Sequence, residues 1–105
     1  MTVGADRDEH NGGDEIANVV GTRIAILREA MGLSQEELAA QAGLHRTTIS
    51  PLELGKGGFR AETLVRIAGV LRVSPSELLV GVYWVPDGGG MGHFTNKAPK
   101  PESPG

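Results

Sequence analysis

The stretch QEELAAQAGLHRTTISPLEL, residues 35–54, predicts two short helices joined by a tight turn. In its first half, Leu38 and Ala42 stand four residues apart, so they lie one turn apart on the same face of a helix. In its second half, Ile49 and Leu52 stand three residues apart and share a face in the same way. Two apolar faces so close in the chain predict that the helices pack against each other.

The turn between these helices is marked by Gly43. Glycine enters left-handed φ/ψ values cheaply, so Gly43 predicts the end of the first helix. Leu44 follows and can turn inward to close the corner. Ala39 falls where the helices should cross, and a larger side chain there would push them apart. A corner of this kind lets a small domain place its second helix in the major groove of DNA.

Apolar spacing and capping signals predict three further helices around the corner. Residues 16–31 have apolar side chains at helical spacing before it. After it, a loop at residues 56–60 precedes a fourth helix, and residues 74–77 (SPSE) predict a capping box that opens a short fifth helix. Residues 34–37 (SQEE) predict the same box at the start of the second helix. The predicted core is Ile24, Leu27, Leu38, Ala39, Ile49, Leu52, Leu64, Ile67, Ala68, Leu71, Val73, Leu78 and Leu79.

The chain divides into one domain between two tails. Residues 1–15 are acidic and lack periodicity, which predicts a disordered arm. Residues 16–85 form the domain, and residues 86–105 shift to Gly, Pro, Lys and Asn, which predicts a flexible tail. We therefore expect an all-α fold of five short helices with disordered N- and C-terminal tails. Residues 82–85 (VYWV) have β character, and their rings would either cap the monomer core or form a dimer interface.

The formal net charge of −3 is concentrated in the first tail. Residues before Val20 sum to −4, residues 21–82 sum to +1, and the remainder sums to zero. The domain is thus not strongly basic, although phosphate contacts supply most of the non-specific affinity of DNA-binding proteins. We expect modest, salt-sensitive DNA binding that requires a homodimer.

Composition argues against several other classes of protein. The chain has no cysteine, so it can form neither a disulfide framework nor a thiolate metal site, and its three scattered histidines predict no metal site either. No apolar run approaches the roughly 20 residues that span a bilayer, and the acidic start does not resemble a signal peptide, which favours the cytoplasm. Neither a nucleophile–base pair nor a cofactor cradle stands out, so neither an enzyme nor a bound cofactor is expected.

Residues 21–79 closely resemble the Cro and phage-repressor type of helix-turn-helix domain, often called the Xre family. The resemblance covers more than half of the chain without a gap, and it implies a lambda-repressor-like fold. It also implies a sequence-specific, repressor-like transcriptional regulator whose partner is double-stranded DNA. The matching segments are GTRI at 21–24, LR at 27–28, GLSQEELA at 32–39, AGL at 42–44, TIS at 48–50, Glu53, GK at 55–56, ETL at 62–64, IA at 67–68 and residues 71–79.

The same resemblance implies which residues contact DNA. Gln35, which opens the second helix, would contact a phosphate and brace a side chain of the recognition helix, while Arg23 would reach the backbone from the first helix. Lys56 and Arg60 would touch phosphates from the loop that follows. Arginine suits base contacts because its guanidinium makes two hydrogen bonds to guanine O6 and N7. The recognition helix would present Arg46, Thr47, Thr48 and Ser50 to bases or backbone.

Two features depart from the family pattern. Pro51 stands where relatives commonly have a polar or basic residue, and a proline inside a helix costs about 3 kcal/mol because it loses a hydrogen bond to the carbonyl of Thr47. We expect the helix to bend or loosen there, and base contacts to come from residues before it. Residues 57–59 (GGF) replace the usual polar residues and proline of the loop, which leaves Lys56 isolated.

These departures favour an alternative function, a protein-interaction module that retains the fold with weak or no DNA binding. A toxin, a sigma-type factor or a sensor protein would then be the partner. Two residues near the recognition helix have structural interpretations. Glu53 is expected to pair with an arginine, either Arg28 or Arg23, and His45 is expected to begin the recognition helix.

Overall fold

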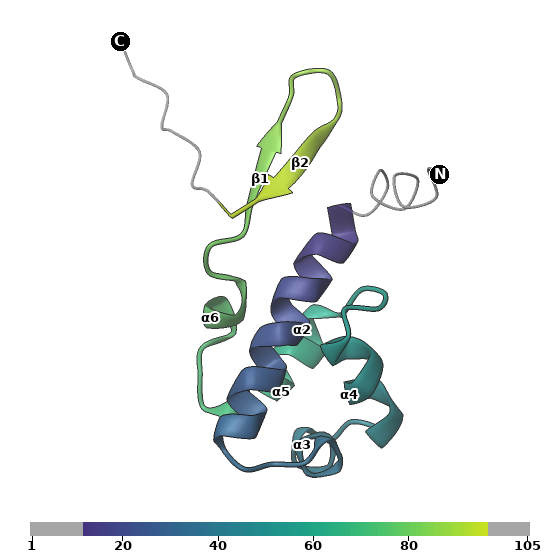
Figure 1. The fold of residues 1–105 in the computed structure, drawn as a ribbon, viewed down its shortest axis with the longest axis vertical. Coiled ribbons are helices and arrows are strands. Elements are labelled where there is room, and N and C mark those ends of the chain that lie inside the picture. The colour runs from purple at the N-terminus through teal and green to yellow at the C-terminus, as the bar shows by residue number, and fades with distance from the viewer. Residues whose placement is uncertain (1–11, 97–105) are drawn as a thin grey trace.

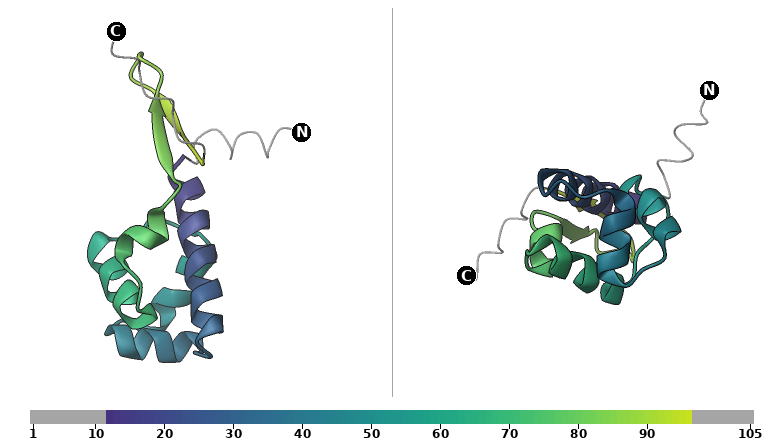
Figure 2. Two further views of the ribbon diagram at one scale, coloured as in Figure 1. Left: turned by 90° about the vertical axis from the view of Figure 1, so that its left-hand side faces the viewer. Right: turned by 90° about the horizontal axis from the view of Figure 1, so that it is seen from below.

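The computed structural model describes residues 12–96, which form a helical body and a β-hairpin (Figure 1). The long helix α2 runs along the body, with α3 at one end of it and the hairpin at the other (Figure 2). No helix within this range combines the length and apolar composition that a membrane span requires. The helices are α2 (Gly12–Ala30), α3 (Gln35–Ala42), α4 (Arg46–Glu53), α5 (Ala61–Leu71) and α6 (Pro75–Leu79), and the strands are β1 (Tyr83–Pro86) and β2 (Gly92–Thr95).

The ends of α3 follow the sequence signals closely. At its start, the amide of Glu37 donates to the hydroxyl of Ser34 at 3.0 Å, and the amide of Ser34 donates to the carboxylate of Glu37 at 2.8 Å. At its end, Gly43 adopts the left-handed conformation with φ of 71°, and the amide of Leu44 donates to the carbonyl of Ala39 at 2.9 Å. The predicted capping box and glycine stop are therefore confirmed, and the corner between α3 and α4 is defined by local hydrogen bonds.

The capping signal before α6 is confirmed only in part. Pro75 is the first residue of the helix, as expected, because its missing N–H costs nothing there. The predicted capping box between Ser74 and Glu77 does not form, since the hydroxyl of Ser74 accepts from the amide of Ser76 at 3.3 Å rather than from that of Glu77. The amide of Glu77 donates instead to the backbone carbonyl of Ser74 at 2.8 Å.

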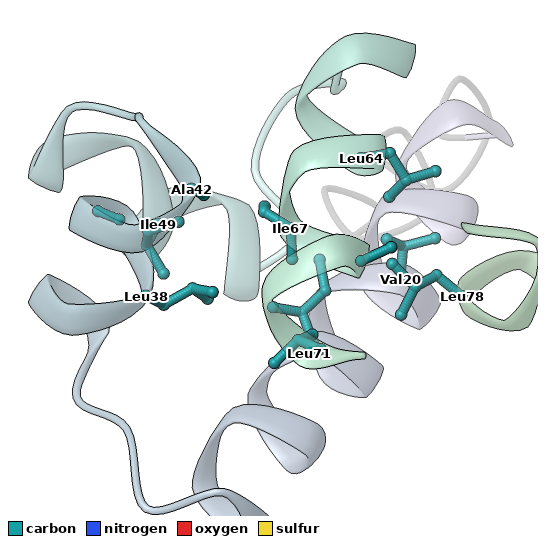
Figure 3. Close-up of a cluster of buried hydrophobic side chains, with 11 residues drawn as sticks. Val20, Leu38, Ala42, Ile49, Leu64, Ile67, Leu71 and Leu78 are labelled. Atoms are coloured by element: carbon teal, nitrogen blue, oxygen red, sulfur yellow. The ribbon is translucent and has the colours of Figure 1, made fainter. Parts of the chain in front are cut away.

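One core gathers the inner faces of all five described helices (Figure 3). Leu27, Leu52 and Val73, also predicted for the core, are half-buried against it. The prediction that Leu79 belongs to the core is wrong. Its exposed fraction is 37%, because the single turn of α6 points Leu78 inward and turns Leu79 away. The buried residues are Ala17, Val20, Ile24, Leu38, Ala39, Ala42, Ile49, Leu64, Ile67, Ala68, Leu71 and Leu78.

Gly21 allows α2 to pack closely against the end of α4. A Cβ at this buried position would lie 2.8 Å from the carbonyl oxygen of Glu53 and closer still to that of Leu52. Both atoms belong to the backbone, so α4 itself would have to move. We expect Gly21→Ala to lower the free energy of unfolding by about 1–3 kcal/mol in chemical denaturation. Gly69→Ala is the matched control, because open space surrounds Gly69 inside α5; a loss there as large as at Gly21 would contradict the role of close packing.

α2 begins earlier than the sequence predicts. Residues 12–15, assigned above to the disordered arm, are helical, whereas residues 1–11 lie outside the described residues. The extra turn has a neighbour that sequence periodicity cannot reveal, since β2 contacts α2 and the side chains of Glu15, Val19 and Phe94 line one hollow. A helix gains one backbone hydrogen bond for each residue it adds, so such a neighbour is enough to extend it.

The segment after Pro86 is also more ordered than expected. The predicted β character of residues 82–85 is confirmed by β1, but β2 pairs with it in antiparallel register and thereby extends the fold to Asn96. The connection between the two strands was expected to be unstructured, but it is a defined turn. The carboxylate of Asp87 accepts from the amides of Gly89 and Met91 at 2.8 and 3.1 Å, and the amide of Asp87 donates to the carbonyl of Met91 at 2.9 Å. The expected tail is thus described only for residues 86–96; residues 97–105 lie outside the described residues.

The two aromatic rings of β1 do not belong to the core. Trp84 packs edge-to-face on Phe94 of β2, with ring centroids 4.9 Å apart, and it also contacts the backbone at Gly92. Exposed fractions are 49% for Trp84 and 36% for Tyr83. Of the two roles considered for these rings, capping the monomer core is therefore wrong, and the dimer interface stays a prediction.

Candidate nucleic-acid interface

α4 begins with a side-chain cap provided by His45. Its Nδ1 accepts from the amide of Thr47 at 3.2 Å and lies 2.7 Å from the hydroxyl of the same threonine. The amide of Thr48 donates to the backbone carbonyl of His45 at 2.9 Å. Amides of the first turn thus have partners before any ligand arrives, and the expectation that His45 begins this helix is confirmed.

α4 continues through Pro51 without interruption. Helical geometry extends from Arg46 to Glu53, so the first turn is not loosened, while a bend at Pro51 stays a prediction. The proline ring lies on the exposed side of the helix, and the backbone beyond it is satisfied: the carbonyl of Ser50 accepts from Leu54 at 3.1 Å, and that of Pro51 accepts from Lys56 at 2.9 Å. Two full turns of α4 are therefore available as one surface.

The outward face of α4 contains the residues expected to contact bases. Ile49 is fully buried and Leu52 half-buried, so the opposite face points away from the body. Helical spacing places Thr47 and Pro51 one turn apart at the middle of that face. The remaining predicted residues flank it: Arg46 and Ser50 are exposed, and Thr48 is half-buried.

Arg46 forms an ion pair across the corner with α3. Its Nη1 lies 3.1 Å from Oε2 of Glu36, and both side chains are 71% exposed. An exposed pair of this kind contributes little stability, so the guanidinium can leave Glu36 for another acceptor at small cost. Sequence analysis did not single out Glu36; the signal available was only its position on the first turn of α3, facing the start of α4.

A partly buried charge network holds the far end of α4. Glu53 accepts from Nε of Arg28 at 2.6 Å and from Nη2 at 3.1 Å, and it also accepts from Nε2 of Gln35 at 2.8 Å. Nη1 of Arg28 donates to the carbonyl of Leu33 at 2.6 Å. The side chains of Arg28 and Glu53 are only 11% and 6% exposed. Of the two arginines considered as partners of Glu53, the structure selects Arg28.

This network fixes α4 relative to both preceding helices. The hydrogen bonds to Glu53 raise the pKa of the Arg28 guanidinium above its ordinary value, because they favour its charged form. The side-chain amide of Gln35 donates to Glu53, which agrees with the bracing role expected for Gln35. Its expected phosphate contact stays a prediction.

Lys56 and Arg60 stand beside α4 on a shared groove of about 510 Å³. Both cations are exposed, so the structure brings Lys56 next to a second positive charge where the sequence suggested that it was isolated. Phe59 forms part of the groove and packs on the core, which anchors the loop between the helices. The groove is lined by Thr48, Pro51, Leu52, Lys56, Gly58, Phe59, Arg60 and Thr63.

Arg23 does not join this surface. Its Nη1 donates to the carbonyl of Leu78, at the end of α6, at 3.1 Å. α6 lies on the other side of α2 from α4 (Figure 1), so the guanidinium has a structural partner away from the outward face of α4. The other seven predicted contact residues lie on α4, in the groove or at the start of α3.

Comparison with known proteins identifies the family. Residues 24–78, more than half of the chain, match the sequence model of the family described as helix-turn-helix. The chain belongs to the Xre-type helix-turn-helix family. The uncharacterized HTH-type transcriptional regulator y4dJ of Sinorhizobium fredii is 37% identical to this helix-turn-helix protein over 65 residues, which cover 62% of this chain and 84% of the relative.

Solved structures of two regulators share the helical body of this helix-turn-helix protein. The restriction-modification controller protein C.AhdI of Aeromonas hydrophila superposes with a TM-score of 0.57 at 35% identity, over 59% of this chain and 94% of its own. SinR, of Bacillus subtilis, was solved in complex with DNA; it superposes with a TM-score of 0.55 at 33% identity, over 57% of this chain and 97% of its own. The expected lambda-repressor-like fold is confirmed by these neighbours.

Proposed function

We propose that this helix-turn-helix protein is a sequence-specific, repressor-like DNA-binding transcriptional regulator that inserts α4 into the major groove. The observation that supports this most directly is the outward face of α4, which is exposed over two turns and adjoins two exposed cations, Lys56 and Arg60. The names of y4dJ and of SinR in its DNA complex support the same function. Base contacts are assigned to Arg46, Thr47, Thr48 and Ser50, and phosphate contacts to Lys56, Arg60 and the start of α3 at Gln35.

The oligomeric state belongs to the same proposal. A dimer would bind a palindromic operator with half-sites about one helical turn apart. The exposed rings of Tyr83 and Trp84, and Val80 three residues before Tyr83 at 62% exposure, supply apolar surface of the kind that buries well between two copies. Sedimentation of the full chain at micromolar concentration tests this, and a strictly monomeric species in the presence and absence of DNA would contradict it.

The decisive experiment is selection of bound DNA from a random pool, followed by footprinting of the selected sequence. The expected result is one enriched motif with two related half-sites and protection over both. Absence of enrichment, together with no gel shift of genomic fragments at low salt, would favour the protein-interaction module instead.

Substitution of the two kinds of contact residue is expected to have different effects. Arg46→Ala should weaken operator binding roughly tenfold and relax the preference at one base position, because a bidentate contact discriminates between bases. Lys56→Ala should weaken operator and random DNA by the same factor and reduce the salt slope of binding by about one.

The control for both variants is Arg72→Asn. Arg72 is exposed at the far end of α5 and has φ of 63°, a conformation that asparagine tolerates, so the charge is removed without backbone strain. The DNA affinity of Arg72→Asn should stay close to that of the wild type. Equal losses for operator and random DNA in Arg46→Ala and Lys56→Ala alike would refute the division between base and phosphate contacts.

A further inference from the structure

Pro51 lies at the middle of the surface that faces the DNA in the proposed function. It is exposed, stands one turn after Thr47, and lines the groove that also contains Lys56 and Arg60. Its ring is absent from the core and from the apolar side chains packed against it. The ring therefore presents its carbon atoms outward on the one helix that would enter the major groove.

The chemistry of a proline ring restricts what it can recognise. It has no hydrogen-bond donor, and its ring carbons cannot accept a hydrogen bond, so it cannot pair with the polar edge of a base. The apolar group that base pairs present in the major groove is the methyl on carbon 5 of a pyrimidine, which thymine always has. An exposed proline at this position fits that group and no polar one.

The other walls of the groove fit the backbone of the same nucleotide. Leu52 and Phe59 extend the apolar wall behind Pro51, while Lys56 and Arg60 place positive charge on the groove. A thymidine nucleotide combines an apolar methyl with an adjacent phosphate, which matches this pairing of apolar and cationic surface.

We propose that Pro51 selects a 5-methylpyrimidine, thymine in ordinary DNA, at one position of each half-site, with Lys56 and Arg60 on the neighbouring phosphate. This inference rests on the proposed function. It assigns specificity to the residue that appeared, from sequence, to weaken DNA recognition. Burial of one methyl group against an apolar ring corresponds to about a fourfold gain in affinity.

The test replaces thymine by deoxyuridine, one position at a time, in the selected operator. Uracil lacks only the 5-methyl group, so base pairing is retained. The wild-type chain should bind about threefold to fivefold more weakly when one particular position in each half-site is changed. Pro51→Ala should show a smaller difference between the thymine and uracil operators, because its helix keeps its favourable geometry and only Cβ remains of the ring.

Two controls separate the proposal from its alternatives. Leu54→Ala removes an exposed apolar side chain just beyond α4, and it should keep the wild-type ratio between thymine and uracil operators. The second control replaces the thymine at the sensitive position by cytosine. An operator with 5-methylcytosine there should bind more tightly than the one with cytosine by the same factor, which distinguishes the methyl group from thymine itself. Thermal melting should show Pro51→Ala to be at least as stable as the wild type.

The outcomes distinguish this inference from the function on which it rests. If no operator is selected and no DNA is retarded, the proposed function fails and the methyl contact with it. If an operator is selected but no thymine position responds to uracil, only the contact by Pro51 is overturned. A uracil effect that persists undiminished in Pro51→Ala overturns it equally, since another residue would then contact the methyl group.

Discussion

Glu53→Ala is expected to lower the free energy of unfolding by about 3 kcal/mol and the thermal midpoint by roughly 10–20 °C. The substitution removes the carboxylate that accepts three of the hydrogen bonds joining α2, α3 and α4, and it leaves the charge of Arg28 without its main partner. Breaking a buried pair is costly because one charge stays out of water uncompensated. The effect should be at the lower end of the usual range, since Arg28 is 11% exposed and can still be hydrated.

Chemical denaturation of Glu53→Ala and Glu29→Ala in parallel checks this. Oε2 of Glu29 also lies 3.6 Å from Nη2 of Arg28, but the side chain of Glu29 is 71% exposed. Removal of this carboxylate should therefore lower the free energy of unfolding by less than about 1 kcal/mol. Similar losses in the two variants would show that burial of the pair contributes nothing. Glu53→Ala should also weaken operator binding under conditions in which it is still folded, because Gln35 and Arg28 no longer hold the end of α4.

Ile49→Ala is expected to cost about 2–4 kcal/mol, a large fraction of the roughly 5–15 kcal/mol by which domains are stable. Ile49 is fully buried and anchors α4 in the core that α3 and α5 share (Figure 3). Its removal takes away apolar contacts and leaves a cavity that rigid neighbours fill only in part. The same change loosens the helix that the proposed function places in the major groove.

The comparison for this variant is Ile26→Ala, the same substitution at a position on α2 that is 59% exposed. Its free energy of unfolding should stay within about 0.5 kcal/mol of the wild type. Far-UV circular dichroism during urea unfolding measures both. If Ile49→Ala proved as stable as Ile26→Ala, the packing of α4 on the core would not be what holds it in place.

Residues close together in the chain made much of this fold predictable. Ser34 with Glu37, Gly43 with Leu44, and His45 at the start of α4 each form hydrogen bonds over a few positions, so their residue types alone predict where the helices begin and end. Apolar spacing did the same for the core, because an inward face repeats with the helical period. The resemblance to the helix-turn-helix family added the expected contact residues.

The errors share a cause in contacts between distant segments. The first turn of α2 has β2 as its neighbour, and β2 itself lies in a stretch whose Gly and Pro content predicts a loop. The hydrogen bond from Arg23 to the carbonyl of Leu78 also joins distant segments, and the DNA contact expected for Arg23 stays a prediction. Neither partner is visible in the local sequence around these residues.

Local chemistry thus decided where the helices start and stop, which residues turn inward, and that a corner of two helices presents the face of Arg46 and Thr47. Tertiary packing decided that α4 continues through Pro51, that Glu53 pairs with Arg28 rather than Arg23, and that Lys56 and Arg60 share one groove. The physical reason is the range of the forces involved. Caps and helical periodicity act within about one turn, whereas a strained helix or a buried charge is stabilised only by side chains that the folded chain brings from elsewhere.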